Sequence, residues 1–490
     1  MPVGFSLTDL SYLSPELVLA GAAIVVLLAD SFVSRARQAV LAWLALAGLA
    51  ATAVCLGVVG APHVTIAGGL LSVDGFAVFF KVVFLLAAAL TVLMSIRYLD
   101  IEGTRTGVYY FLVLSATLGM MFMASALELI TIFIGLETMA ISFYILAGFL
   151  KPNRRSNEAA VKYFLLGTFS LGLLLYGMSL LYGLTGTTSL RAVATALSGQ
   201  EQNPWLVLAV ILVVSGMAFK IAAVPFHMWA PDVYEGAPTP ITAFISVGSK
   251  AASFAMLLRI FVEGLPLMID KWRILFYALA VITMIVGNIA ALTQGNIKRM
   301  LAYSSIAHAG YLMIGVVAGT TRGYTAMLIY LMIYAFMQTG AFAVVTLMRR
   351  QDVIGDELKD LSGLYARSPA AAVAMLIFML SLGGIPPTAG FMGKYWLFSA
   401  AIEAGYVWLA VIGVLNSAVS LYYYVRVIVF MWIKGEAAGS PAVVSPAMAV
   451  TLTVALVGTL VLGMYPQPLF EFAMASARTL GVVGLAATLP

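Results

Sequence analysis

Four charged residues lie inside long apolar stretches of the sequence, and their types are those that exchange protons. Glu137 lies in ELITIFIGLETMAISFYILAGF, Lys220 in VVSGMAFKIAAV and Lys250 in TAFISVGSKAASFAMLL. Lys394 lies in SLGGIPPTAGFMGKYW. Apolar surroundings favour the neutral amine of a lysine, whereas a nearby carboxylate favours the charged ammonium. A glutamate–lysine pair whose separation changes can therefore take up and release a proton.

The depth of these residues excludes an ordinary surface role. At 1.5 Å per helical residue, Glu137 lies about 15 Å beyond Leu127, halfway through a hydrocarbon core about 30 Å thick. A charge at the centre of a membrane helix costs about 2.5–3.5 kcal/mol, so the four together would cost about 10–14 kcal/mol if they faced lipid. We therefore expect them to face the interior of the protein. One glutamate cannot neutralise three lysines, which favours proton transfer over a structural ion pair.

Other titratable residues are weaker candidates for a proton relay. His308 lies about 12 Å into its apolar stretch, and the alternative is a core histidine bonded to a backbone carbonyl. Lys162 lies near the start of another stretch, so its alternative is an interfacial position. For His227, beside Pro225, the alternative is a polar loop role. Lys81 is close to the start of its stretch, and we expect its ammonium to reach the membrane surface.

The composition requires that these stretches cross a membrane. Of the 490 residues, 62% are hydrophobic and 10% are charged, against about 25% charged residues in a soluble domain. A soluble enzyme is therefore excluded. The net charge of +5 fits basic loop residues better than nucleic-acid binding. With a single cysteine, Cys55, and no Gly-rich phosphate motif, we expect no metal, iron–sulfur cluster or nucleotide in this chain.

Apolar runs separated by polar or Gly/Pro-containing breaks predict an all-α polytopic membrane protein with about fourteen transmembrane helices. Loops after odd-numbered helices hold fourteen basic residues, and the other loops and the tail hold five. Because basic loops stay in the cytoplasm, both termini should lie on the opposite side. The predicted helices span residues 13–33, 39–60, 76–96, 107–126, 127–150, 157–183, 204–229, 240–262, 273–294, 299–319, 323–348, 369–402, 404–432 and 443–465.

Two of the predicted helices contain proline-rich interruptions. The seventh carries Pro225, and the twelfth carries Pro386 and Pro387. Isolated proline kinks are one alternative, but paired broken helices are typical of transporters built from inverted repeats around a midplane site. Helices 4–8 and 9–13 would then be the two repeats. The expected organisation is a three-helix segment (1–106), two inverted five-helix repeats (107–263 and 264–434), and a C-terminal helix and tail (435–490).

Several motifs resemble those of the antiporter-like, proton-pumping membrane subunits of NADH–quinone oxidoreductase, the respiratory complex I. The resemblance rests on AFKIAAVPFHMWAPDVYEGAPTP with the SVGSKAA that follows, on GNIKRMLAYSSIAHAGYLMIG, and on SLGGIPPTAGFMGKYW, and it covers nearly the whole chain. It implies that Lys162 is a further family lysine. The subunit types differ at the position of Lys394, where one carries glutamate, so the lysine favours another type. The proton path implied by the resemblance consists of Glu137, Lys220, Lys250 and Lys394.

The resemblance also implies partners and cofactors. The chain would translocate protons in the bacterial inner membrane, coupled to NADH oxidation and quinone reduction in other subunits. NADH, FMN, iron–sulfur clusters and quinone would be bound by those partners. Its neighbours would be the lipid bilayer and other membrane-arm subunits, including related antiporter-like ones, without nucleic acid. The alternatives are a subunit of a multi-subunit cation/proton antiporter, which shares the fold and the lysines, and a structural scaffold whose ion pairs serve assembly.

Overall fold

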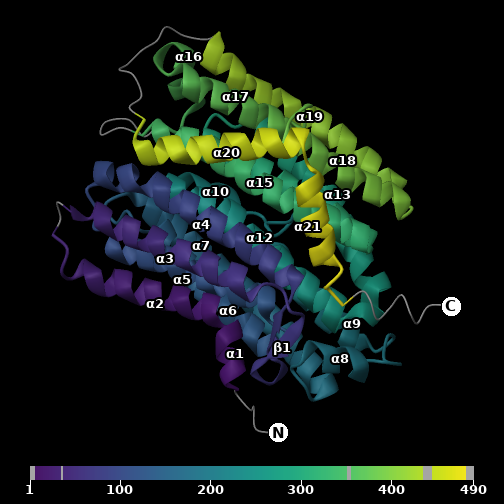
Figure 1. Cartoon of the computed structure of the whole chain (residues 1–490). Coiled ribbons are helices and arrows are strands. Elements are labelled where there is room, and N and C mark those ends of the chain that lie inside the picture. The colour runs from purple at the N-terminus through teal and green to yellow at the C-terminus, as the bar shows by residue number, and fades with distance from the viewer. Residues whose placement is uncertain (1–5, 35–36, 350–354, 434–443, 482–490) are drawn as a thin grey trace.

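The computed structural model describes residues 6–34, 37–349, 355–433 and 444–481. These residues form a bundle of helices with one small β-hairpin (Figure 1). Eleven of the described helices are long and apolar enough to cross a membrane. The prediction of an all-α polytopic membrane protein is therefore confirmed, whereas the number of fourteen crossings stays a prediction.

The N-terminal part contains three long helices and the hairpin. Strands β1 and β2 pair antiparallel, with Val64 opposite Val73. The side chain of Asp74 caps the helix that follows, because it accepts the N–H of Ala77 at 2.8 Å. The elements are α1 (Leu7–Tyr12), α2 (Ser14–Asp30), α3 (Ala39–Val59), β1 (Val64–Ile66), η2 (Ala67–Gly69), β2 (Leu71–Val73) and α4 (Gly75–Glu102).

The elements in the middle of the chain are all helices, and polar caps set the ends of several of them. Asn153 and Asn296 each accept a backbone N–H in the first turn of a helix, and left-handed glycines end the same two helices at Gly186 and Gly319. The elements before the next long helix are α5 (Gly107–Ser125), α6 (Leu129–Ala147), α7 (Arg154–Thr185), α8 (Leu190–Ala196), α9 (Pro204–Lys220), α10 (Trp229–Gly236), α11 (Thr239–Phe244), η3 (Ile245–Ser249), α12 (Lys250–Leu258), η4 (Arg259–Gly264) and η5 (Pro266–Met268).

The remaining helices complete the bundle. Thirteen of the fourteen predicted segments coincide with one helix or with consecutive helices, with ends that differ by a few residues. The seventh, 204–229, covers α9 and the break after it and ends at the first residue of α10. These elements are α13 (Ile269–Leu292), α14 (Ile297–Ala318), α15 (Thr321–Leu347), η6 (Leu358–Leu361), α16 (Leu364–Arg367), α17 (Pro369–Gly383), α18 (Ala389–Glu403), α19 (Val407–Trp432), α20 (Pro446–Met464) and α21 (Gln467–Ala477).

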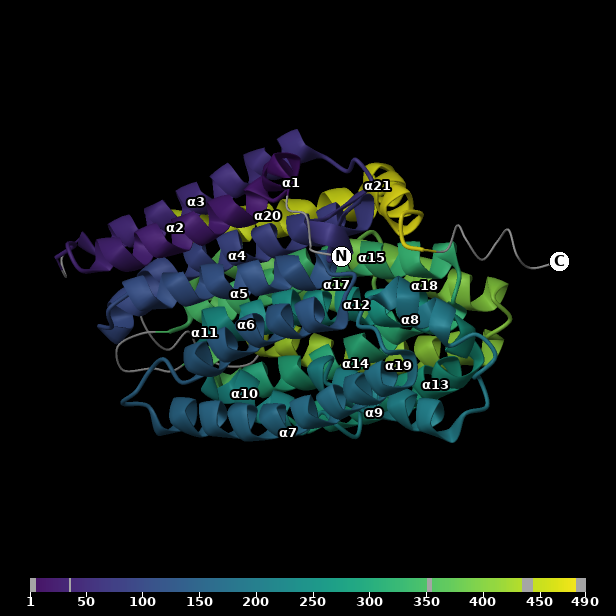
Figure 2. The same cartoon turned by 90° about the horizontal axis from the view of Figure 1, so that it is seen from below.

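Burial separates central helices from peripheral ones. The continuous segment from α11 to η4 is buried along its whole length, and α14 and α15 are almost as fully enclosed. Figure 2 shows α7 and α9 on one face of the bundle and α2 and α3 on the opposite face. The outer helices expose large apolar side chains, among them Phe169, Trp408 and Val58. The centre of the bundle is thus shielded from the outer faces that would meet lipid.

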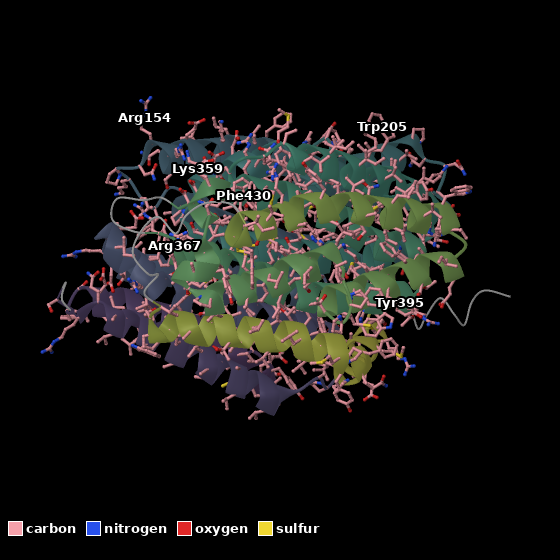
Figure 3. All side chains as sticks on the ribbon, turned by 90° about the horizontal axis from the view of Figure 1, so that it is seen from above. Arg154, Trp205, Lys359, Arg367, Tyr395 and Phe430 are labelled. Atoms are coloured by element: carbon pink, nitrogen blue, oxygen red, sulfur yellow. The ribbon has the colours of Figure 1, made fainter. Side chains whose placement is uncertain are left out.

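Basic loop residues gather toward one end of the bundle. Arg154, Lys359 and Arg367 lie toward one end, whereas Trp205 lies at the other (Figure 3). The three basic residues all belong to loops after odd-numbered predicted helices, as the predicted orientation requires. Three further basic residues used for that prediction lie outside the described residues, namely Arg35, Arg350 and Lys434.

Both proline-rich interruptions are real breaks in the helices. One lies between α9 and α10 and the other between α17 and α18. The protein binds the backbone freed at the first break: the indole N–H of Trp229 donates to the carbonyl of Phe219 at 2.9 Å, and Thr283 accepts the N–H of Val224 at 3.0 Å. The sequence did not predict a third irregularity, the π-helical turns η3 and η4 on either side of α12.

The C-terminal helices connect distant parts of the chain. Helices α20 and α21, yellow in Figure 1, pack against both α15 and the N-terminal α4. After α21, the hydroxyl of Thr479 accepts the N–H of Phe76, in the first turn of α4, at 3.0 Å. Helices of the first, third and last predicted segments thus pack together. The predicted division into four segments stays a prediction.

Candidate functional site

Glu137 and Lys220 form the first pair of the predicted pathway. Glu137 is half-buried on α6, and Lys220, the last residue of α9, is 4% exposed. Their charges interact electrostatically. Among the described residues, neither Oε1 of Glu137 nor Nζ of Lys220 has a hydrogen-bond partner. The pair is therefore coupled through charge without being locked by a hydrogen bond, which leaves it free to change its separation.

Lys250 lies in the middle of the buried segment that runs from α11 to η4. It is 3% exposed, and its ammonium donates to the carbonyl and to the hydroxyl of Ser305, the latter at 2.5 Å. The same hydroxyl shares a hydrogen bond of 3.2 Å with that of Tyr234, on α10. Nζ also lies 5.1 Å from the ring centroid of Tyr334. The amine of Lys250 thus begins a polar route into α14.

His308 continues this route on the same helix. It is 1% exposed, and its ring nitrogens bond the hydroxyls of Tyr330 at 2.6 Å and Tyr424 at 3.1 Å. The hydroxyl of Tyr424 also bonds that of Ser304, the neighbour of Ser305, at 2.5 Å. The partners of His308 are hydroxyl groups and not the backbone carbonyl of the alternative interpretation. Imidazole and hydroxyl groups both donate and accept hydrogen bonds, so the cluster has the chemistry of a relay.

Lys394 binds the backbone at the break between α17 and α18. Its ammonium donates to the carbonyls of Leu382 and Gly383 at 3.0 and 3.1 Å and to the hydroxyl of Ser417 at 2.7 Å. These carbonyls are freed where α17 ends, and the C-terminal end of a helix attracts a cation. The ring of Tyr311 lies 5.0 Å from Nζ. The lysine thus supplies hydrogen-bond donors to the carbonyls that are freed at the helix break, which the sequence predicts next to it.

His308 lies between the two lysines that follow Lys220 in the predicted path. Its imidazole contacts the rings of Tyr334 and Tyr311, with centroids 5.2 and 5.7 Å away, and these rings face Lys250 and Lys394. The histidine and these two lysines are at most 4% exposed. The structure therefore brings three of the predicted site residues into one buried cluster, and a histidine stands between two amines that could exchange a proton through it.

Lys162 lies apart from this cluster. Its ammonium is 2.7 Å from the carboxylates of both Glu158 and Asp232, and its side chain is 41% exposed. It lines an open cavity of about 210 Å³ together with Arg299, which is also paired with Asp232 at 2.7 Å. The position matches the interfacial alternative, and a relay role for Lys162 stays a prediction.

The remaining predicted residues lie at the helix breaks. His227 is half-buried in the segment between α9 and α10, and its Nδ1 has no hydrogen-bond partner among the described residues. Pro225, in the same segment, is exposed, as are Pro386 and Pro387 at the second break. The prolines therefore face outward from the chain, while the lysines beside the two breaks, Lys220 and Lys394, face its interior.

The prediction that Lys81 reaches the membrane surface is wrong. Lys81 is 2% exposed, and its ammonium is 2.6 Å from the carboxylate of Glu16. Helix α2 covers this side of the chain and supplies a buried anion from its first turn. Because the partner lies within the protein, the ammonium does not need to extend to the headgroups.

Two further buried cations were not predicted from the sequence. Arg259 is fully buried in η4, where it forms a bidentate ion pair with Asp74 at 2.7 and 2.9 Å and a second pair with Glu263. Lys298 donates to the carbonyls of Glu235 and Ala237 at 2.8 and 2.7 Å, at the end of α10. The spacing of Arg259 and Glu263, four residues apart in an apolar stretch, was the signal that could have revealed the first cluster.

The fold and the buried charges define the class of protein. A polytopic membrane bundle with two broken helices, each beside a buried lysine, is an antiporter-like architecture. A family model described as "NADH:quinone oxidoreductase/Mrp antiporter, TM" matches residues 126–420. This range includes Glu137, Lys220, Lys250 and Lys394. The chain belongs to this family.

Relatives that match over nearly the full length indicate which type of subunit within the family this chain resembles. The NADH-quinone oxidoreductase subunit N of Trichlorobacter lovleyi is 48% identical over 97% of this chain and 98% of its own length. A chain of respiratory complex I from Thermus thermophilus, solved with bound aureothin, is 34% identical with a TM-score of 0.80 and covers 94% of this chain and 99% of that one. These similarities confirm the resemblance found in the sequence. Subunit N, the subunit 2 type, is the type that Lys394 favours.

The same architecture occurs in a chain of an Mrp complex. A chain of the Mrp complex from a Dietzia species has a TM-score of 0.81, covering 97% of this chain and 98% of that chain, at 23% identity. At this identity the similarity shows the shared fold alone. The curated relatives, which match at about twice that identity, point to subunit N instead.

Proposed function

We propose that this chain is the proton-translocating subunit N of an NADH–quinone oxidoreductase in a bacterial inner membrane. The proposal is supported by curated relatives of that name over the full length and by a structural neighbour within respiratory complex I. NADH oxidation and quinone reduction take place in other subunits, which bind FMN, the iron–sulfur clusters and the quinone. Both termini lie on the non-cytoplasmic side, and the neighbours include related antiporter-like subunits.

The first step of the proposed mechanism takes place at Glu137 and Lys220. A change along the membrane arm alters the distance between the carboxylate and the ammonium, and with it the affinity of Lys220 for its proton. The observation that favours this step is that Nζ of Lys220 lacks a hydrogen-bond partner among the described residues. Because no hydrogen bond holds the ammonium there, a change in its distance to Glu137 acts directly on the affinity of the amine for its proton.

The later steps use the buried cluster on α14. The proton released by Lys220 is taken up by Lys250, whose amine lies 2.5 Å from the hydroxyl of Ser305. It then passes through the hydroxyl groups around His308 to Lys394. The three hydrogen-bonded groups around Lys250, His308 and Lys394, all buried within the bundle, are the single observation that carries the proposal. Lys394 then releases the proton at the second break, where the helix is already open.

Lys162 and His227 have a subordinate place in this mechanism. Lys162 belongs to the charged cavity at the beginning of α7, so it exchanges protons with water at that end of the bundle. His227 lies in the first break and contributes a polar group beside the Lys220 step. Both roles rest on position, and each is tested by replacement with glutamine.

The central experiment is Lys220→Ala in the assembled oxidoreductase in inverted membrane vesicles. We expect the number of protons pumped per NADH oxidised to fall, and electron transfer to slow with it if coupling is tight. The exposed Lys359 provides the matched control, because Lys359→Ala removes the same group outside the bundle interior. An unchanged ratio of protons to electrons at an unchanged rate of NADH oxidation in Lys220→Ala would contradict the mechanism.

Purification in mild detergent separates this function from that of a multi-subunit antiporter. We expect the chain to be isolated with the NADH-oxidising and quinone-reducing subunits. Recovery with antiporter subunits, and without NADH oxidation in the preparation, would instead support the cation/proton antiporter.

A further inference from the structure

Each of the three buried lysines of the proposed path faces the ring of a tyrosine. Nζ of Lys220 lies 5.8 Å from the ring centroid of Tyr144. The corresponding distances are 5.1 Å at Lys250 and 5.0 Å at Lys394. An ammonium within about 6 Å of an aromatic ring is attracted by the negative face of the ring. The ring supports the charged amine without accepting its proton.

The three lysines differ in what else supports them. Lys250 and Lys394 donate hydrogen bonds to carbonyl and hydroxyl oxygens. Lys220 has no such acceptor among the described residues. Its charge is balanced by Glu137 through space and by the ring face of Tyr144. At Lys220 the aromatic contact therefore has a larger share in holding the ammonium than at the other two lysines.

The ring of Tyr144 is held firmly between two helices. Tyr144 lies on α6, seven residues and two turns after Glu137, so the two side chains leave the same face of the helix. Its hydroxyl fits against the bare backbone of Gly167 on α7, where a Cβ atom would approach the oxygen to 2.2 Å. Any larger residue at position 167 would displace the ring.

Further aromatic contacts connect Tyr144 back to the end of α9. Its ring meets that of Tyr163 edge to face, with centroids 4.8 Å apart. Tyr163 stacks on Trp229 at 4.6 Å, and the indole N–H of Trp229 donates to the carbonyl of Phe219, directly before Lys220. The contacts form a closed circuit through α6, α7, α10 and α9. The orientation of the ring relative to the lysine is thereby fixed.

We propose that the ring face of Tyr144 is the second binding position of the Lys220 ammonium, which Lys220 occupies when Glu137 is drawn away. Tyr144 is then a positioning residue for the first proton transfer, and the inference rests on the proposed proton-pumping function. The aromatic ring carries this role. The hydroxyl group has no hydrogen-bond partner among the described residues, so its removal leaves no acceptor or donor unsatisfied.

The test replaces Tyr144 in the assembled oxidoreductase by a series of side chains of nearly constant shape. Phe, monofluoro-, difluoro- and trifluorophenylalanine progressively weaken the negative ring face, and Leu removes it. We measure proton pumping and NADH oxidation in inverted vesicles. We expect Phe to remain within about twofold of the native rate, and coupled turnover to fall stepwise with fluorination to between about 5- and 30-fold lower for Leu.

The matched control uses the ring at Lys250. The same fluorinated residues at Tyr334 should have a smaller effect, because Lys250 keeps its hydrogen bonds to Ser305. The hydroxyl of Tyr334, like that of Tyr144, has no hydrogen-bond partner among the described residues. If the Leu variant fails to assemble, the fluorinated series still decides, since those rings fill the same space. A flat response to fluorination at position 144 overturns the inference, as does a Phe variant as impaired as Leu, which would assign the role to the hydroxyl.

Lys220→Ala, measured in parallel, separates a failure of the proposed proton-pumping function from a failure of the inference about the Tyr144 ring. If this variant pumps normally, the proposed function of the Glu137–Lys220 pair fails. If it stops pumping while the fluorinated series at Tyr144 is flat, the function stands and the inference about the ring is wrong.

Discussion

Replacement of Lys250 by arginine separates the movement of a proton from the presence of a charge. The guanidinium group keeps the positive charge and can donate to Ser305 as the ammonium does. With ordinary pKa values of about 10.4 for lysine and about 13.8 for arginine, the neutral fraction of the side chain falls about 2500-fold. A relay that needs a neutral group at position 250 should therefore slow by roughly a thousandfold, which ends pumping through this chain.

The structural cost of this replacement is modest. Position 250 is 3% exposed, and insertion of extra atoms into a packed core costs about 1–3 kcal/mol. We expect somewhat less assembled complex in native gels but no loss of the fold. Protons pumped per NADH oxidised are then measured in inverted vesicles at equal complex content, with Lys359→Arg at an exposed site as the control.

Normal pumping in Lys250→Arg would instead indicate a structural role for the lysine. If Lys250→Arg pumps as many protons per electron as the native chain, position 250 serves as a fixed charge. The lysines would then act as structural ion-pair and capping residues of a scaffold. Normal assembly with lost pumping excludes that scaffold.

Three other replacements test the buried cations outside the pair at Glu137. Arg259→Met leaves two buried carboxylates without their cation, so we expect a loss of about 3–5 kcal/mol, seen as a lower thermal transition of the purified complex; an unchanged transition would show that these carboxylates are solvated. Lys81→Met should lower the yield of complex, and adding Glu16→Leu should restore it; failure of the double variant to recover would contradict the ion-pair explanation. Lys394→Met removes the donor to two carbonyls, one of which Ser417 still serves, so assembly should change little while pumping stops; normal pumping would exclude Lys394 as the exit residue.

Much of the candidate site could be predicted because an isolated charge in an apolar run is visible without knowledge of its neighbours. Glu137, Lys220, Lys250 and Lys394 each carry a cost that membrane depth alone imposes. The two breaks were equally visible, since prolines remove backbone donors wherever the chain goes. The class of fold followed from the same apolar runs.

The partners of these charges could not be predicted in the same way. Ser305 lies 55 residues from Lys250 in the sequence, and a serine in a membrane helix has many possible roles. Lys81 was misplaced for this reason, because the decisive carboxylate of Glu16 belongs to a different helix. The π-helical turns beside Lys250 also carry no mark in the sequence, since they arise from how the surrounding helices pack around that segment.

The hydrogen bond between Phe76 and Thr479 has a consequence for the biosynthesis of the chain. The two residues are 403 positions apart, which corresponds to about 20–80 s of synthesis at about 5–20 residues per second. Helix α4 enters the membrane early, yet one of its first-turn N–H groups finds its acceptor only when the last described residues have been made. The face of α4 that α20 and α21 cover stays open for the same time. The translation of the final helices therefore completes the packing around α4. A chain that ends before Thr479 would leave a first-turn N–H group of this early helix without its acceptor.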